Sequence, residues 1–345
     1  MVHCTGASRL NVPLSLPSMP SLTMLICTHN RAALLAKTLV SLNAAARPQD
    51  WAVDILVAAN ACSDATHAFL DDYSRDAAAR GWLPLIWFAE PTPGKSHALN
   101  NALPRLTGDM AAFVDDDHRV DAGYLQAVCA AAQAHPQAGL FCGRILPDWD
   151  GSEPPWVHDK GPYRIYPLPV PRFDLGDAPL EVTPELAIPG GGNLFLRTDW
   201  LGRVGLFSTD LGPTGHDLGG SEDMEWVLRA LQLGAHLQYV PDAIQYHHVD
   251  TRRLTLPYII KKAYKRTAST VLLDPKLQGC KPPRYLYRKL AGHIVAALTS
   301  VGQAKRRFFL VRTAATLGEF AGYRQRGKRC PPVHAALAQQ PDRHA

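Results

Sequence analysis

The sequence has no CxxC pair, and its seven cysteines are odd in number. An odd number leaves at least one thiol without a partner, and zinc ribbons and fingers need closely spaced cysteine pairs. Several of the cysteines also lie inside apolar runs. We therefore expect neither a disulfide framework nor a structural zinc site. A reducing cytoplasm is the expected compartment.

Long hydrophobic runs are also missing. The longest apolar run near the C-terminus is Leu290–Val301, whereas a transmembrane helix needs about 20 residues. At the other end, no basic cluster precedes an apolar segment, and Pro13, Pro17 and Pro20 interrupt the residues near the N-terminus. These features match a signal peptide poorly. The sequence predicts a loose leader over residues 1–20 and no membrane span.

Acidic residues are scarce in one part of the chain only. Residues 251–330 hold 19 Lys and Arg against 2 Asp and Glu, a net charge of +17. Residues 1–250 hold 16 against 28, a net charge of −12. Lys and Arg interleaved with Leu, Ile and Phe suit a helix lying on an anionic membrane surface. The alternatives are a solvated helical face, or helices that pack against the acidic part of the chain.

Strand and helix patterns alternate over the first part of the chain. Apolar runs at 22–28, 52–60, 83–89 and 109–117 predict strands, and the segments between them predict helices. This alternation is typical of an α/β fold with a largely parallel sheet covered on both faces. Each predicted strand ends in polar residues, at the edge where such sheets bind ligands.

The rhythm changes after residue 138. Residues 147–189 contain ten prolines, which predicts a long irregular excursion with a functional role. A helix over 221–234 and two short strands within 235–249 come next. We expect a basic helical extension over 251–330 and a disordered tail over 331–345.

The stretch AAFVDDDHRV, residues 111–120, places three aspartates after an apolar strand. Strand side chains alternate, so Asp115 and Asp117 are expected on one side and Asp116 on the other. Two carboxylates at a strand end suit one hard divalent cation, Mg²⁺ or Mn²⁺. The alternative is an ordinary acidic turn.

Three further motifs suggest chemistry, and each has a structural alternative. Glu222 and Asp223 begin a helix after paired glycines, where one could act as a general base or both could simply favour the helix dipole. The glycine run before Asn193 permits close backbone approach to a ligand, or only a turn. The pair His247 and His248 could ligate metal or be structural.

The segment Ala89–Asn100, AEPTPGKSHALN, matches a phosphate-loop pattern loosely. Alanine replaces its first glycine, and Pro91 and Pro93 remove two N–H donors that would cradle phosphate. A phosphate-loop NTPase is therefore disfavoured, although Lys95 at a helix start could still meet a diphosphate.

Taken in order, these motifs resemble the family 2 glycosyltransferases of the GT-A fold, over about residues 21–256. The resemblance implies a Rossmann-like, mostly parallel mixed sheet flanked by helices, with a nucleotide-binding half at 21–137 and an acceptor half at 138–250. It implies an inverting transfer of a sugar from a nucleotide-diphosphate sugar to a hydroxyl acceptor, with Mg²⁺ or Mn²⁺ as cofactor. A non-catalytic nucleotide-sugar-binding protein of the same fold is the alternative.

The resemblance also assigns roles to residues. Asp223 matches the catalytic base, with Glu222 beside it, and Trp149 and Trp156 become candidate acceptor-stacking surfaces in a lid. The nucleotide-sugar site would comprise Thr28, Asn30, Arg31, Asn60, Asp64, Lys95, Asp115 and Asp116. Gly191, Gly192 and Asn193 match the floor under the donor sugar and acceptor. The metal ligands would come from Asp115, Asp117, His247 and His248.

One position departs from the family pattern. Many members carry an acidic residue before the position of Asn60, where it contacts uracil, and this chain has Ala59. The nucleotide base is therefore left open between uridine, guanosine and others. The expected partners are the donor, a glycan or lipid-linked acceptor in cell-surface polysaccharide synthesis, and an anionic membrane surface, with no nucleic acid. The enzyme is expected in the cytoplasm, peripheral to the inner face of the membrane.

Overall fold

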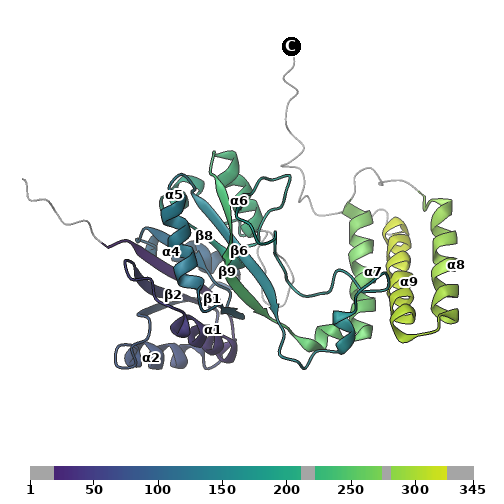
Figure 1. The fold of residues 1–345 in the computed structure, drawn as a ribbon, viewed down its shortest axis with the longest axis horizontal. Coiled ribbons are helices and arrows are strands. Elements are labelled where there is room, and N and C mark those ends of the chain that lie inside the picture. The colour runs from purple at the N-terminus through teal and green to yellow at the C-terminus, as the bar shows by residue number, and fades with distance from the viewer. Residues whose placement is uncertain (1–18, 211–221, 274–280, 325–345) are drawn as a thin grey trace, which may run out of the picture. The chain divides into compact units, whose positions relative to one another are not determined.

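The computed structural model describes residues 19–210, 222–273 and 281–324 (Figure 1). The chain divides into two compact units. The first contains the described residues up to Leu146 together with Arg172–His248, and the second contains Pro147–Pro171 together with the described residues from Val249 onward. The predicted leader, apart from its last two residues, and the predicted tail lie outside the described residues.

A mixed sheet forms the centre of the first unit. Its described strands run in the order β3-β2-β1-β4-β8-β6-β9-β5, and β7 pairs with β9. The strands are β1 (Ser21–Thr28), β2 (Ala52–Asn60), β3 (Leu85–Glu90), β4 (Met110–Phe113), β5 (His118–Val120), β6 (Leu140–Asp148), β7 (Leu180–Glu181), β8 (Leu194–Arg197) and β9 (Leu237–His248).

The sheet changes character along its width. Strands β1 to β4 pair in parallel, whereas β8 pairs antiparallel with β4 and β6, and β9 pairs antiparallel with β5 and β7. The mixed α/β fold is confirmed, but its parallel part is confined to the first four strands. Antiparallel strands need no helical crossover, which explains why the α/β rhythm of the sequence stops after residue 138.

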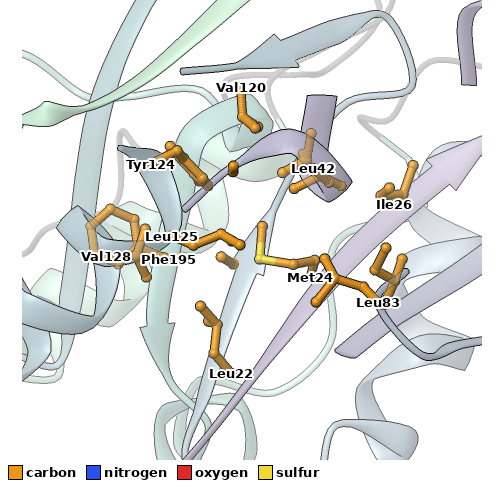
Figure 2. Close-up of a cluster of buried hydrophobic side chains, with 14 of the residues drawn as sticks. Leu22, Met24, Ile26, Leu42, Leu83, Val120, Tyr124, Leu125, Val128 and Phe195 are labelled. Atoms are coloured by element: carbon orange, nitrogen blue, oxygen red, sulfur yellow. The ribbon is translucent and has the colours of Figure 1, made fainter. Parts of the chain in front are cut away.

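Helices cover both faces of this sheet, and the alternation of residues within each strand decides which face a side chain joins. Leu22, Met24 and Ile26 of β1 join one core, whereas Leu25 joins the other. Figure 2 shows the first core, in which Leu42 of α1 (Ala32–Ala44) and Tyr124, Leu125 and Val128 of α4 (Tyr124–Ala134) gather with the β1 side chains. The helices of this face are α1, α2 (Thr66–Asp76) and α4.

The opposite core is formed with α3 (Lys95–Ala102), α5 (Asp199–Val204) and α6 (Glu222–Gln232). Trp226 is fully buried there and stacks on Phe207. Gly139 and Gly143 allow close packing beside β6, because a Cβ atom would collide with Trp200 at the first position and with the backbone of Ala243 at the second. Glycine is required at both places for steric reasons.

Residues 237–248 form one strand, so the prediction of two short strands is wrong. This strand contains Pro241, although proline usually interrupts a strand ladder. Strand β7 pairs with residues 238 and 239, and β5 pairs with residues 245 to 247. Pro241 therefore falls between the two paired stretches, where its missing N–H breaks neither of them.

The second unit is largely helical. It contains α7 (Leu256–Leu273), α8 (Arg284–Thr299) and α9 (Gln303–Arg324), preceded by the short turns η2 (Pro155–His158) and η4 (Thr251–Leu254). Helix α9 packs against both α7 and α8. Gly318 lies at the α7 contact, where a Cβ atom would meet the carbonyl of Tyr264 and the hydroxyl of Thr267.

The proline-rich segment 147–171 belongs to this second unit, whereas the sequence predicted it inside the acceptor half. Asp159 forms a 2.9 Å ion pair with Arg307, and Tyr163 packs on Phe308 and Phe309. These partners lie on α9, more than 140 residues further along the chain, so no local pattern indicated them. Within the described residues, no helix has the length and hydropathy that a bilayer crossing requires.

Candidate active site

A pocket of about 480 Å³ opens where β1, β2 and β4 end. Parallel strands of this kind present their carboxyl ends at one edge, which is where ligands bind. The lining residues are Cys27, Thr28, His29, Asn30, Arg31, Asn60, Lys95, Asp115, Asp116, Asp117 and His247. The pocket therefore brings together most of the residues that the sequence predicted for the nucleotide-sugar and metal sites.

The aspartate triplet lies in a turn and not in a strand. Strand β4 ends at Phe113, and the backbone N–H of His118 donates to the carbonyl of Asp115 at 3.0 Å to close the turn. The prediction that the alternation of strand side chains separates Asp116 from Asp115 and Asp117 is therefore wrong, because these residues are not in a strand. A turn gives each carboxylate its own direction, and the three have different partners.

Asp116 is 5% exposed and is held by two donors. The hydroxyl of Thr28 donates at 2.7 Å, and Arg31 donates at 3.0 Å while it also reaches Asp117 at 3.0 Å. Burial, together with the charges of Asp117 and Asp115, raises the pKa of Asp116 to about 6, although Arg31 opposes that shift. Arg31 therefore bridges two of the three carboxylates at the rim of the pocket.

Lys95 and Asp115 form a 2.7 Å ion pair that lines the pocket. Burial alone would lower the pKa of Lys95, but the charge and hydrogen bond of Asp115 outweigh it and raise that pKa. The same pair holds the pKa of Asp115 well below its usual range, against the effect of burial. Both groups are therefore charged, and Lys95 is a fixed cation inside the pocket.

His118 is 2% exposed, and its Nε2 has no hydrogen-bond partner among the residues that the structure describes. Its Nδ1 lies 2.6 Å from Oε1 of Gln245. The Gln245 Nε2 donates to the Phe113 carbonyl, the Tyr124 hydroxyl and Asn193 Oδ1, so Oε1 is free to act as the acceptor. His118 must then carry its proton on Nδ1, which leaves a lone pair on Nε2.

Asn193 closes this buried network. Its Nδ2 donates to the carbonyls of Arg144 and Ala243, both at 2.8 Å, so its Oδ1 faces the donors Gln245 and Tyr124. Asn193 is 1% exposed and does not line the pocket, where the sequence placed it as part of a floor. It instead supports the residues behind His118.

Ligand atoms of Asp117, His118 and His247 all lie within 4.8 Å of one another. The rings of the two histidines meet edge to face at 4.9 Å, and His247 Nε2 lies 3.8 Å from Asp117 Oδ1. Burial lowers the pKa of His118, which favours the neutral form that binds metal. One carboxylate and two imidazoles with an unpartnered buried Nε2 fit a divalent transition metal such as Mn²⁺.

The other predicted ligands lie differently. His248 is exposed, because consecutive strand residues point to opposite faces, and its backbone N–H donates to the Asp117 carbonyl at 2.9 Å. Asp115 Oδ2 lies 3.8 Å from His118 Nε2, but its Oδ1 is engaged by Lys95. The sequence missed His118 and Gln245, although His118 directly follows the triplet and Gln245 shares a strand face with His247.

Asp223 lies in the first turn of α6, beside the glycine run. The N–H of Gly191 donates to its Oδ2, and the N–H of Met224 donates to its Oδ1 at 2.8 Å. A Cβ atom on Gly191 would lie 3.0 Å from the Asp223 side chain, and one on Gly192 would lie 2.8 Å from Asp115 Oδ2. The glycines thus let these carboxylates approach the backbone closely.

A second, narrow cavity is lined by Asp223 and Gly191. Cys27, Lys95 and Asp115 line both cavities, so the Lys95–Asp115 ion pair adjoins both the cavity at Asp223 and the pocket that holds the metal-ligand cluster. Glu222, next to Asp223, is 2% exposed. The glycines and serine that precede it in the sequence motif, Gly219 to Ser221, lie outside the described residues.

The remaining predicted residues organise the loops. Asn60 accepts from the Gly94 N–H at 2.9 Å and donates to the Thr92 carbonyl at 2.7 Å, which fixes the segment before Lys95. Asn30 Oδ1 accepts from the N–H groups of Ser63 and Asp64. Since the Gly94 N–H is already bound, it is not available to cradle phosphate, which adds to the argument against a phosphate-loop NTPase.

Asp64 does not line the pocket. Its Oδ1 accepts from the Thr66 N–H at 3.0 Å, near the start of α2. Trp149 and Trp156 belong to the second unit, where Trp149 contacts His158 and Trp156 lies beneath the Arg307 guanidinium. Their role as acceptor-stacking surfaces stays a prediction.

Comparison with known proteins identifies the family of this chain. The family model described as glycosyl transferase family 2 matches residues 23–203, more than half of the chain. The succinoglycan biosynthesis protein ExoM of Rhizobium meliloti (strain 1021) is 24% identical over 306 residues, which cover 86% of this chain and 91% of ExoM.

Solved structures of S. aureus TarS share the fold. TarS 1–349 in complex with UDP-GlcNAc has a TM-score of 0.51 and 16% identity, covering 86% of this chain and 90% of that chain. The longer TarS chain has the same TM-score and 17% identity, and the match spans 80% of the present chain and 42% of that TarS chain. The chain belongs to glycosyl transferase family 2 and is a glycosyltransferase with the GT-A fold.

Proposed function

We propose that this enzyme transfers a sugar from a nucleotide-diphosphate sugar to a hydroxyl group in a single displacement that inverts the anomeric centre. The observation that carries the proposal is the position of the Lys95–Asp115 ion pair, which lines both the larger pocket and the narrow cavity at Asp223. The donor diphosphate would then lie in the larger pocket and the acceptor hydroxyl at Asp223, with this ion pair next to both.

Asp117, His118 and His247 would hold the divalent cation, which neutralises charge on the departing nucleoside diphosphate. Lys95 and Arg31 supply two further positive groups at the same pocket. A phosphate oxygen that approaches Lys95 has to share it with Asp115, so donor binding would loosen the 2.7 Å ion pair. Cationic groups fixed in this way favour the state in which the diphosphate leaves.

Asp223 is the proposed general base. Its two oxygens accept from the N–H groups of Gly191 and Met224, which fixes the direction of the carboxylate before an acceptor arrives. The acceptor oxygen forms its bond to the anomeric carbon while its proton passes to Asp223, and the bond from that carbon to the diphosphate oxygen breaks. Glu222 is buried beside it, in a position to support Asp223.

Relatives of this chain support the class of donor and the class of product, but not a particular nucleotide or glycan. ExoM is named for succinoglycan biosynthesis, which supports a role in cell-surface polysaccharide synthesis with a glycan or lipid-linked acceptor. TarS has been solved with UDP and with UDP-GlcNAc, which supports a nucleotide-sugar donor. Ala59 is fully buried and has no polar side-chain atom with which to contact a base. Both UDP-sugars and GDP-sugars are therefore offered in the experiment below.

We also propose that the enzyme works in the cytoplasm at an anionic membrane surface. The support comes from α8 and the residues just after it, where apolar side chains are exposed and the helix also carries the exposed cations Arg284 and Arg288. Exposed apolar residues on a basic helix are typical of interfacial binding. The exposed residues are Tyr287 at 57%, Ile294 at 41%, Leu298 at 78% and Val301 at 94%.

The transfer reaction is tested with the full chain, freed of metal by a chelator and supplied with Mn²⁺. UDP-sugars and GDP-sugars are offered with and without simple glycoside acceptors, and release of nucleoside diphosphate is measured. We expect release that depends on Mn²⁺ and on one donor, and a product anomer opposite to that of the donor by NMR. ATP hydrolysis would favour an NTPase, and donor binding without any release would favour a non-catalytic protein.

The membrane part is tested separately by co-sedimentation with vesicles. We expect salt-sensitive binding to anionic but not to neutral vesicles, and loss of that binding in Leu298→Asp, which places a charge on the exposed apolar face. Equal recovery on both vesicle types, or no binding to anionic vesicles at low salt, would remove the membrane proposal and leave the transfer reaction intact.

A further inference from the structure

The second unit contains a pocket of about 270 Å³ that shares no residue with the active-site pocket. Its walls come from residues 165–169, one face of α7 and one face of α9. On each helix the lining residues follow the spacing i, i+3, i+4 and i+7, which places them on one side. They are Ile259, Lys262, Ala263 and Arg266 on α7, and Phe308, Val311, Arg312 and Ala315 on α9.

The walls combine two kinds of chemistry. Most lining residues are apolar, with Ile165, Leu168 and two prolines completing the side that faces the helices. The exceptions are Lys262, Arg266, Arg312 and Tyr166, and no lining residue is acidic. Such a pocket complements a ligand that has an anionic head and an apolar body.

The three cations have no carboxylate partner within residues 19–210, 222–273 and 281–324. Lys262 and Arg266 are like charges four residues apart, an arrangement that destabilises a helix slightly. Burial, with the charges of Arg253 and Arg266, lowers the pKa of Lys262, which agrees with cationic surroundings. Acidic residues of this unit are engaged elsewhere: Asp159 with Arg307, Asp250 with Arg252, and Glu319 with Lys289.

We propose that this pocket binds a long-chain phosphate ester, with the phosphate held by Lys262, Arg266 and Arg312. The first carbons of the chain lie against Ile259, Phe308 and Val311. Arg side chains bind phosphate oxygens through paired N–H groups, and Lys binds as a point charge. The apolar walls favour this ligand over a free polyphosphate, which would leave the apolar side chains exposed to water.

The size of the pocket argues against a docked helix. A helix with its side chains is about 10–12 Å across, so a pocket of about 270 Å³ could take a few of its side chains but not the helix itself. One phosphate and a few carbons fill that volume, and the rest of the chain would extend outside. The proposal is independent of sugar transfer, and it goes beyond surface attraction because it predicts stoichiometric binding of one lipid head.

The test measures binding of farnesyl phosphate to the full chain. A chelator is present to remove divalent cations, and the probe is kept below the concentration at which it aggregates. Farnesol supplies the chain without the charge, and inorganic phosphate supplies the charge without the chain. The test variant is the double substitution Lys262→Gln with Arg312→Gln. The matched control is Lys261→Gln with Arg306→Gln, which removes the same charge from the same two helices at residues that are exposed, as Lys262 and Arg312 also are, but lie outside the pocket.

We expect one farnesyl phosphate per chain, binding at least about tenfold more tightly than farnesol or phosphate, because both kinds of contact are needed. The pocket double variant should weaken this binding about tenfold or more, and the control should not. Thermal unfolding of both variants checks that they fold. Equal binding of farnesol, equal binding of inorganic phosphate, equal loss in the control, or no binding of farnesyl phosphate would each overturn the proposal.

Discussion

Nδ1 of His118 lies 2.6 Å from Oε1 of Gln245, and the amide of Gln245 is held by three further acceptors. This contact sets the tautomer of His118 and leaves Nε2 with a lone pair in a buried position. A hydrogen bond to the far nitrogen of a ligating histidine is the usual way in which proteins fix ring orientation at metal sites. The arrangement makes His118 a testable ligand beside Asp117 and His247.

His118→Phe is predicted to lower the affinity for Mn²⁺ by about 10-fold or more, because loss of an outer-shell partner alone typically costs about 10- to 100-fold and this variant removes a ligand. Phenylalanine keeps a ring against His247 but removes both nitrogens. It also leaves Gln245 Oε1 without a donor, which costs about 1–3 kcal/mol of stability. Mn²⁺ binding is measured directly by calorimetry or electron paramagnetic resonance, after circular dichroism has confirmed folding, so activity is not needed.

His248→Phe is the matched control, because His248 is adjacent to His247 but exposed. It should leave Mn²⁺ affinity within about twofold of the parent, as expected for an exposed residue outside the cluster. If the two variants lose affinity equally, His118 has no special role. If neither variant changes it, the metal is held elsewhere.

The choice of metal follows from the same donors. Imidazole nitrogens suit transition metals, whereas Mg²⁺ prefers oxygen ligands and gives up water reluctantly. After removal of metal with a chelator, we predict that Mn²⁺ restores release of nucleoside diphosphate at lower concentrations than Mg²⁺ does, by about tenfold or more. Equal restoration by both ions would indicate that phosphate and carboxylate oxygens dominate and that the histidines are not ligands.

Much of this fold follows from the sequence. The alternation of strands and helices up to residue 138 predicted the parallel strands, and the polar residues at the strand ends predicted the pocket. Period-two alternation also explains the two cores, as with Met24 on one face and Leu25 on the other. These features are local, so short windows of sequence contain them.

The features that the sequence could not predict depend on contacts between distant residues. The 147–171 segment joins the second unit through Asp159 and Tyr163, whose partners lie on α9. Pro241 stays within one strand because β5 and β7 pair on either side of it. His118 and Gln245 are 127 residues apart. Neither residue type indicates a site by itself, since a single histidine is most often structural.

Gly143 gives a prediction for stability. A Cβ atom there would collide with the Ala243 carbonyl and would lie 2.9 Å from the Ala243 Cβ atom. Gly143→Ala is therefore expected to lower the free energy of unfolding by about 1–3 kcal/mol, the usual cost of overpacking a core. Chemical denaturation measures it through the midpoint and slope.

Gly202→Ala is the corresponding control, because a Cβ atom meets nothing within 4 Å at this helical position. Alanine is the better helix former by up to about 1 kcal/mol, so this change should be neutral or slightly stabilising. If Gly143→Ala were equally neutral, the close approach of β6 to β9 could relax without cost, and glycine would not be required at position 143.

Asp223→Asn tests the proposed base. Asparagine preserves the size of the side chain and keeps one carbonyl oxygen for a backbone N–H, so donor binding should persist. Transfer should fall by about 100-fold or more, because the acceptor proton no longer has a carboxylate to receive it. Binding is measured by calorimetry with the donor and Mn²⁺, and turnover by release of nucleoside diphosphate with acceptor present.

Glu225→Gln, on the same helix and paired with Arg229, is the control and should keep turnover. Unchanged turnover in Asp223→Asn would transfer the role to Glu222 or to another group, whereas loss of donor binding would mean that Asp223 holds the sugar and does not accept the proton.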